Sequence, residues 1–243
     1  MMRNVFLIAL LLACTTLHGI AQDLPQVLVF SKTKGFRHDS IEKGAEAIQE
    51  LGHEHGFGVY HTEDAGVFTD DQLQKYKAIV FLSTTGDILD PEQQASFERF
   101  IQAGNGFVGI HAASDTEYDW PWYGKMVGGY FASHPEVQTA DIHVHDHSHL
   151  ATHHLPEIWK HKDEWYDFKE LNPDVNLLMT IDEESYQGGK MGDYHPVSWH
   201  HTYDGGRAFY TALGHTKEAY DDADFLQHIA GGIAYALGKT RNN

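Results

Sequence analysis

Two histidines follow apolar segments at positions where α/β proteins carry reactive side chains. His111 comes directly after the apolar residues 107–110 and is followed by two alanines. Small residues after a buried strand allow a sharp turn, and such a turn lifts a side chain above the carboxyl edge of the sheet, where ligands bind. His215 stands at the end of the expected strand 207–213. We therefore predict that both imidazoles lie at the same edge of one sheet.

An imidazole pair at such an edge can bind a transition metal, transfer protons as a general acid and base, or pack as buried histidines. His38 is a third candidate, and the guanidinium of Arg37 beside it can hold a substrate oxyanion or hydroxyl groups. We expect any bound metal to be a divalent ion, zinc or manganese, with His111, His215 and His134 as its ligands, and with His38 or Glu164 as the alternatives to His134.

Two carboxylates are candidates for acid–base chemistry. Glu164 can act as a metal ligand or as a base, and the alternative is that it forms a solvated acidic pair with Asp163. Asp115 follows the His111 turn, and hydrolysis by Asp115 and Glu164 would require carboxyl oxygens about 5–10 Å apart. The alternating histidines of residues 143–149 would lie on one strand face, which we interpret as a solvated face that binds metal weakly at most.

Aromatic side chains near these polar groups suit stacking against a sugar, although aromatic residues at this density are also ordinary core. The chain has no Gly-rich phosphate loop of the Walker or dinucleotide type, so we expect no nucleotide cofactor. The candidate substrate-binding residues are Arg37, His38, Trp122, Tyr166 and Trp199.

Apolar strands and amphipathic helices alternate through the first half of the chain, and antiparallel alternation follows residue 136. This predicts an α/β fold with a doubly wound, mostly parallel flavodoxin-like sheet, helices on both faces and an antiparallel β extension. Asp90 and Gln93 form a capping box with Pro91 at the first helical position. Gly52 is expected to end the first helix. The expected strands are 26–31, 57–60, 78–82, 107–110, 136–145, 165–168, 176–181, 197–203 and 207–213.

Size and charge limit the function classes. A chain of 243 residues can form one core, and it has no repeats or low-complexity linker, so we expect one domain over residues 22–243. The formal net charge of −18 disfavours nucleic acid and anionic membranes as partners, because phosphate binding requires lysine and arginine. The sequence leaves the oligomeric state open.

Residues 1–21 have the pattern of an export signal, with a basic start at Arg3, an apolar stretch and small residues before Ala21. We expect cleavage after Ala21 and a periplasmic location. A lipoprotein anchor at Cys14 is the alternative, on a weak lipobox match. Cys14 is the only cysteine, so thiol nucleophiles and cysteine-bound metals are excluded from the mature domain.

Residues 26–240 resemble the trehalose-utilisation (ThuA-like) family. The resemblance implies a fold like that of class I glutamine amidotransferases, in which His111 falls where the nucleophilic cysteine would be and His215 where the catalytic histidine would be. Without the thiol, glutaminase chemistry is not possible. The pair His149-Leu150 departs from the His-Pro expected for the family. The matching motifs lie at 35–38, 109–115, 133–135, 163–166, 196–200 and 206–215.

The resemblance also implies a role in disaccharide catabolism, alongside sugar dehydrogenases that make 3-keto-glycosides. We therefore expect an exported hydrolase or lyase that acts on glycosidic bonds of sugars or oxidised glycosides, such as trehalose-type disaccharides. Its catalytic residues would be His111, His215, Glu164 and Asp115, because a 3-keto group acidifies the neighbouring C2 proton and acid–base groups could then start elimination. The alternative is a non-catalytic sugar-binding protein that kept the fold.

Overall fold

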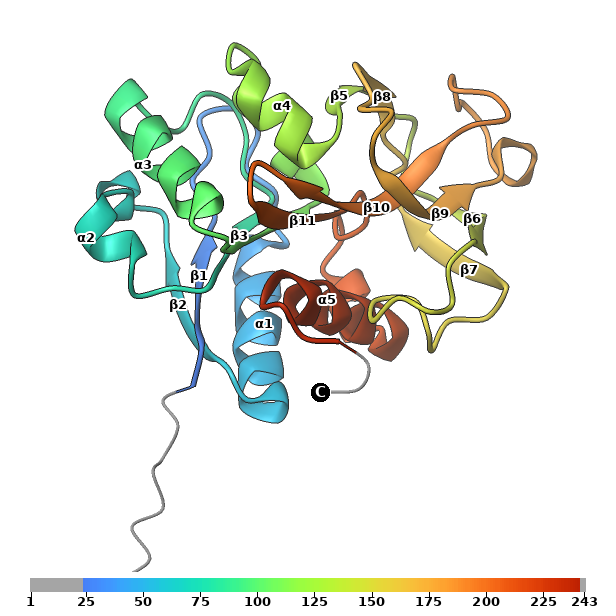
Figure 1. Ribbon diagram of the computed structural model, residues 1–243. Coiled ribbons are helices and arrows are strands. Elements are labelled where there is room, and N and C mark those ends of the chain that lie inside the picture. The colour runs from blue at the N-terminus through green and yellow to red at the C-terminus, as the bar shows by residue number, and fades with distance from the viewer. Residues whose placement is uncertain (1–23, 241–243) are drawn as a thin grey trace, which may run out of the picture.

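The computed structural model describes residues 24–240, and a nine-stranded sheet runs through them (Figure 1). Its strands are β1 (Gln26–Phe30), β2 (Gly58–Thr62), β3 (Ala78–Leu82), β4 (Gly106–Ile110), β6 (Gln138–Val144), β7 (Ile158–Asp163), β9 (Asn176–Ile181), β10 (Pro196–Tyr203) and β11 (Gly206–Thr211). Their order across the sheet is β2-β1-β3-β4-β11-β10-β9-β6-β7. The strands from β2 to β11 in this order are parallel, and the others are antiparallel to their neighbours. The predicted parallel sheet with an antiparallel extension is confirmed.

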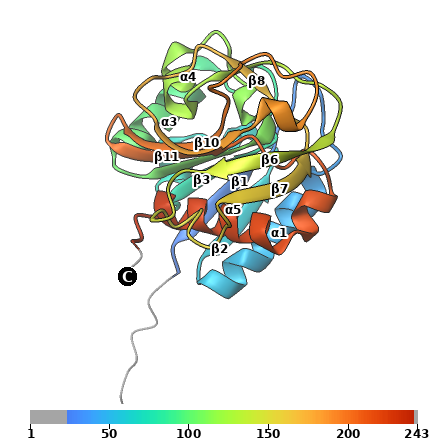
Figure 2. The same cartoon turned by 90° about the vertical axis from the view of Figure 1, so that its right-hand side faces the viewer.

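Helices cover both faces of the sheet, as predicted. In Figures 1 and 2, the first and last helices lie on one face, and the third and fourth lie on the other. The helices are α1 (Ile41–His55), α2 (Asp70–Leu73), α3 (Pro91–Gln102), α4 (Pro121–Val127) and α5 (Ala223–Ala236). Single turns of 3₁₀ helix are η1 (Ala65–Val67), η2 (His111–Ser114), η3 (Glu183–Ser185) and η4 (Glu218–Asp221).

The helix ends show how well local sequence signals fix boundaries. The capping box of α3 is present, since Asp90 accepts from the amide of Gln93 and the Gln93 side chain accepts from the amide of Asp90. The prediction that Gly52 ends α1 is wrong. The helix continues to His55 and ends on Gly56 in the left-handed conformation, with φ of 74°. Gly52 instead allows close packing, because a Cβ there would lie 2.7 Å from the carbonyl oxygen of Phe57.

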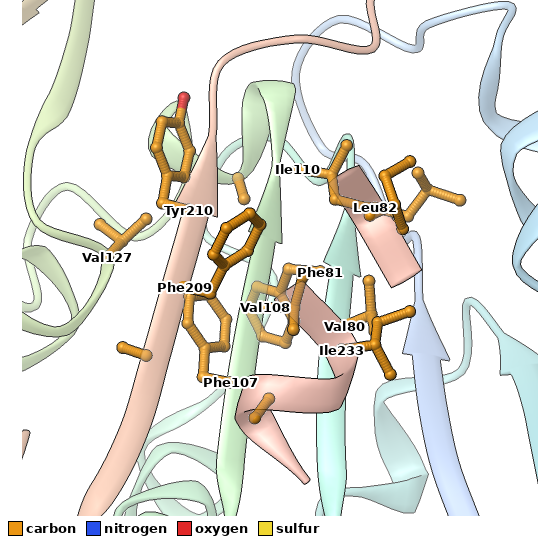
Figure 3. Close-up of a cluster of buried hydrophobic side chains, with 14 of the residues drawn as sticks. Val80, Phe81, Leu82, Phe107, Val108, Ile110, Val127, Phe209, Tyr210 and Ile233 are labelled. Atoms are coloured by element: carbon orange, nitrogen blue, oxygen red, sulfur yellow. The ribbon is translucent and has the colours of Figure 1, made fainter. Parts of the chain in front are cut away.

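The core lies around the inner parallel strands, whereas the parallel edge strand β2 is partly exposed. All residues of β3 and β4 are buried, as is typical of parallel strands covered by helices on both sides. Figure 3 shows side chains of β3, β4 and β11 packed together, with Ile233 of α5 beside Val80. This packing holds the strand ends in fixed positions, and the loops that follow those ends carry the polar residues.

The antiparallel part differs from the sequence prediction in two places. The strand expected at 165–168 is shifted to β8 (Asp167–Lys169), and it pairs with β5 (Tyr130–Ser133) in a separate two-stranded sheet. Both β5 and β7 were missed. Since β7 alternates polar and apolar residues with two lysines and a histidine, its apolar signal is weak.

The histidines of residues 143–149 do not lie on one strand face, because β6 ends at Val144. His145 and His147 are exposed, whereas His149 is nearly buried and stacks on His200 with ring centroids 4.3 Å apart. The predicted signal peptide at 1–21 lies outside the described residues. Within residues 24–240, every helix is too short or too polar to cross a bilayer.

Candidate functional site

Four side chains from four different loops converge beyond the carboxyl edge of the parallel strands. His38 follows β1, His111 follows β4 and His215 follows β11. Glu164 follows β7, at the far end of the antiparallel extension. One ligand atom from each of these residues lies within 4.8 Å of the ligand atoms of the other three. The strand ends of a doubly wound sheet thus bring His111 and His215 together, as the sequence argument predicts.

The distances within this four-residue cluster are short. The Nε2 atom of His111 lies 3.2 Å from His38 Nε2 and 3.1 Å from His215 Nδ1. The Oε2 atom of Glu164 lies 3.1 Å from His215 Nδ1 and 3.6 Å from His111 Nε2. His111 is completely buried, His38 and Glu164 are nearly so, and His215 is partly exposed. The cluster therefore has one open side.

His111 is held in a strained conformation. Its φ of 52° lies in the left-handed region, which costs a non-glycine residue about 1–3 kcal/mol. Its carbonyl accepts a hydrogen bond of 2.8 Å from the Tyr210 hydroxyl, and its Nδ1 donates to the carbonyl of Ala212 over 2.7 Å. Because Nδ1 carries the proton in the neutral ring, Nε2 presents its lone pair to the cluster.

Asp163 fixes the loop that carries His215. Its Oδ2 accepts from the amide of Gly214 at 2.7 Å, and its Oδ1 accepts from the amide of His215 at 3.0 Å. Asp163 is completely buried and Glu164 is nearly so. The alternative interpretation of these two residues as a solvated acidic pair is therefore wrong. They join the end of β7 to the end of β11 at the site.

The charges of the cluster follow from its burial and its short contacts. Burial lowers the pKa of His38 to about 3, assisted by His111 and His215, so His38 is neutral. Burial opposes the charge of Glu164, but its hydrogen bonds with His111 and His215 outweigh this and lower its pKa. Burial likewise opposes the charge of His215, and the contact with Glu164 outweighs it and raises the pKa of His215. An ionised carboxylate thus lies among three imidazoles.

The residues present fit a divalent metal. Ligands about 2.0–2.1 Å from a tetrahedral ion lie about 3.3–3.4 Å from one another, by the geometry of a tetrahedron. The atom separations of 3.1–3.6 Å in the cluster bracket this value. His111 Nε2 has a single lone pair but faces three polar atoms, and a central cation would satisfy all four groups. Three imidazoles and one carboxylate suit zinc or manganese.

His134 does not reach this donor set, although it was predicted to bind the metal. Its Nδ1 lies 2.9 Å from Oε1 of Glu164, the oxygen that does not face His111. Its ring is at the rim of the cavity, and its side chain is 43% exposed. In the structure His38 and Glu164 complete the set, and His134 holds Glu164 from outside.

A second group, Asp167, Glu183 and His195, also has its donor atoms within 4.8 Å of one another. Its geometry differs from that of the cluster. His195 Nδ1 lies only 2.8 Å from Glu183 Oε1, a hydrogen-bond distance that is too short for two ligands of one tetrahedral ion. His195 Nε2 lies 2.8 Å from the carbonyl oxygen of Tyr166. These two contacts hold the His195 ring between Glu183 and the backbone of Tyr166.

The four-residue cluster opens into a cavity of about 270 Å³. The Tyr166 ring lies over His111 with centroids 4.3 Å apart. Asp115 also lines the cavity, and one of its oxygens accepts a 2.6 Å hydrogen bond from the Tyr118 hydroxyl. Burial raises the pKa of Asp115, and the Tyr118 bond opposes that rise. The lining residues are Phe36, His38, Asp115, Phe131, His134, Glu164, Tyr166 and His215.

Three predicted substrate-binding residues do not line this cavity. Trp199 is completely buried and stacks on Tyr210 at 4.5 Å, so it has no surface to offer a sugar. Trp122 donates its indole N–H to Asp204 in a hairpin turn elsewhere. Arg37 forms ion pairs of 2.6 and 2.8 Å with two acidic side chains, Glu42 and Glu63.

Phe36 and Phe131 are the aromatic residues that the sequence analysis missed. Phe36 lies in the motif that contains His38, so its position next to a candidate site residue was the available signal. Phe131 belongs to the unpredicted strand β5, and its ring packs on Tyr166 at 4.4 Å. His38 and Tyr166 lie at the cavity as predicted.

Comparison with solved structures identifies proteins that share this fold. The chain superposes on a ThuA-like protein from Bacteroides uniformis with a TM-score of 0.77 and 22% identity, over 92% of this chain and 96% of that one. A ThuA-like protein from Parabacteroides merdae gives a TM-score of 0.74 and 20% identity, over 91% of this chain and 93% of that one. A β-galactosidase from Bacillus circulans sp. alkalophilus gives a TM-score of 0.60 and 14% identity. The superposition covers 89% of this chain but only 31% of that one. These similarities show a shared fold.

Comparison of the sequence with protein-family models identifies the family as well as the fold. None of the curated proteins matches the sequence significantly. The model of the ThuA family, described as trehalose utilisation, matches residues 26–236, which is nearly the whole described chain and contains every residue of the cluster. The chain therefore belongs to the ThuA family of trehalose-utilisation proteins.

Proposed function

We propose that this protein is an enzyme of carbohydrate breakdown that acts on sugars or on oxidised (3-keto) glycosides such as trehalose-type disaccharides. The observation that carries the proposal is the convergence of three imidazoles and one carboxylate at metal-ligand spacing, where His38, His215 and Glu164 line an aromatic cavity. The family's association with trehalose utilisation supports the substrate class.

His38, His111, His215 and Glu164 would hold a divalent ion, zinc or manganese. A bound ion would supply positive charge to the oxygen anion that develops when a 3-keto sugar loses its C2 proton. The chain contributes the orientation of this set. His111 is aimed by the Ala212 carbonyl, His215 by Asp163, and Glu164 by His134.

Asp115 is the proposed base. One carboxyl oxygen is held by Tyr118, and burial raises the pKa of Asp115 toward the range in which a base is most effective. Asp115 would take the C2 proton. The electron pair of that C–H bond would form the C1–C2 double bond while the C1–O bond breaks, and the departing oxygen would take a proton from His134 at the rim. Addition of water across the double bond would complete a net hydrolysis.

The same proposal includes the source of the substrate and the cellular location of this protein. A sugar dehydrogenase would produce the 3-keto-glycoside, because this chain has no nucleotide-binding loop of the known types for that oxidation. An export signal at 1–21 would place the enzyme in the periplasm, with lipid anchoring at Cys14 as the alternative.

The test combines metal analysis with turnover. Protein purified without a histidine tag should contain about one zinc or manganese ion per chain. His111→Ala should lose this metal, whereas His145→Ala should retain it, because His145 lies outside the cluster. A panel of 3-keto-disaccharides and their parent sugars, assayed with and without each ion, should show cleavage that depends on the metal.

The outcomes separate the hypotheses. Failure to cleave any glycoside, with or without metal, would refute the enzymatic proposal. If the protein binds sugars but turns none over, and His111→Ala leaves the affinity unchanged, the non-catalytic sugar-binding hypothesis is correct. Metal that is retained in His111→Ala and lost in His145→Ala would place the metal site on residues 143–149 instead.

A further inference from the structure

Phe36 is an exposed aromatic residue at the mouth of the cavity. Its exposed fraction is 66%, the largest among the exposed large hydrophobic residues of the described chain. It lines the cavity, and its ring meets His38 edge-to-face with centroids 4.8 Å apart. Leaving most of a phenylalanine ring in water forfeits about 25 cal/mol for every Å² that it could bury. The fold gives no packing reason for this exposure.

The loop that carries Phe36 is firmly anchored, so the exposure is not a consequence of a loose loop. The Thr85 hydroxyl donates to the carbonyl of Phe36 at 2.9 Å and accepts from the amide of Gly35 at 3.1 Å. The Lys34 amide donates to the Thr85 carbonyl at 2.8 Å. Thr85 itself is completely buried. Gly35 permits this contact, because a Cβ there would lie only 3.3 Å from the Thr85 side chain.

The size of the cavity limits how much of a substrate it can enclose. Its volume of about 270 Å³ lies below the range of about 300–1,000 Å³ that is usual for sites holding drug-sized ligands. Three members of the cluster, His38, Glu164 and His215, line the cavity, and His111 is completely buried. A reacting sugar ring must therefore fill the cavity, and any group attached to that ring must project outward past the rim.

We infer that Phe36 is a stacking platform for the second ring of the substrate, the ring joined through the bond that is cleaved. This inference rests on the proposed function. A pyranose presents a face of C–H groups that matches the exposed face of the phenyl ring, and burying both faces would recover the apolar area that Phe36 leaves in water. The substrate class is thus glycosides with a ring-containing leaving group, in preference to methyl glycosides.

The experiment compares Phe36→Ala and Phe36→Trp with the wild type, all loaded with the metal. Two substrates are used: a 3-keto-disaccharide and a 3-keto methyl glycoside that lacks the second ring. Phe36→Ala should raise KM for the disaccharide about tenfold with kcat unchanged, and should leave KM for the methyl glycoside unchanged. Phe36→Trp should retain the wild-type preference. Tyr60→Ala is the control, because Tyr60 is an exposed aromatic residue on the edge strand β2.

Metal content distinguishes stacking from a structural role. Because Phe36 touches His38, Phe36→Ala could act by disturbing the cluster, and stoichiometric metal in that variant excludes this. Equal losses on both substrates, an unchanged KM for the disaccharide, or loss of metal would each overturn the inference. A wild type that neither binds nor cleaves either substrate would instead refute the proposed function, and the inference would fall with it before any variant is compared.

Discussion

Asp163 and His215 are joined by a 3.0 Å hydrogen bond between a carboxylate oxygen and a backbone amide, although 51 residues lie between them. The other oxygen of Asp163 accepts from the amide of Gly214 at 2.7 Å. One buried carboxylate at the end of β7 therefore fixes the loop after β11. This contact couples the antiparallel extension of the sheet to the site on its parallel part.

Replacing Asp163 with alanine should lower both stability and metal affinity. The change leaves the backbone amides of Glu164, Gly214 and His215 without this acceptor, and a lost hydrogen bond to a charged group costs about 1.5–3 kcal/mol. We expect the free energy of unfolding, measured in urea, to fall by about 3 kcal/mol or more. Asp141→Ala removes an ion pair with Lys160 at the surface and should cost less than about 1 kcal/mol. Equal losses in the two variants would contradict the role given to Asp163.

Glu164 and His134 should affect metal binding to different degrees. Glu164→Gln removes a ligand charge, whereas His134→Gln removes a group that only holds Glu164 from outside. Loss of such an outer partner typically lowers metal affinity by about 10–100-fold, and loss of a ligand should lower it further. Competition with a chelator measures both affinities. If His134→Gln were the more damaging change, His134 would be a ligand and our assignment would be wrong.

The sequence located His111 and His215 because apolar strands followed by small residues mark the carboxyl edge of a parallel sheet. It also named Glu164 as a candidate ligand or base, but it did not place Glu164 at the end of a strand, because β7 alternates polar and buried residues and no apolar run marks its end. Trp199 was assigned to a sugar site because sequence alone does not separate core aromatics from rim aromatics. Its full burial against Tyr210 depends on contacts between β10, β11 and α4 that only the assembled fold defines.

Tyr118→Phe should shift the pH dependence of the proposed reaction. The Tyr118 hydroxyl stabilises the charged form of Asp115 and opposes the effect of burial on its pKa. Removing that hydroxyl takes away the largest interaction that opposes burial, so the pKa of Asp115 should rise. A base works only when deprotonated, so the acidic limb of kcat/KM against pH should move to higher pH. Tyr60→Phe, distant from the site, should leave the profile in place. An unmoved limb in Tyr118→Phe would show that Asp115 is not the base.

His228 should make the fold sensitive to acid. It is completely buried beneath the sheet, its Nδ1 donates to the carbonyl of Ala151 at 2.8 Å, and burial lowers its pKa to about 3. The unfolded chain takes up a proton near the ordinary histidine pKa of about 6.5, whereas the folded chain does not. Because the unfolded state binds more protons between these values, stability is fully present above pH 6.5 and declines as the pH falls toward 3.

The measurement compares wild type with His228→Asn at pH 7 and pH 5 by urea unfolding. Asparagine can still donate to the Ala151 carbonyl but does not titrate. At 1.36 kcal/mol per pH unit, the wild type should lose about 2 kcal/mol more than the variant between pH 6.5 and pH 5. His53→Asn, an exposed substitution on α1, should lose as much as the wild type. If wild type and His228→Asn lose stability in parallel, His228 is not a source of the acid sensitivity, and the other buried histidines must carry it.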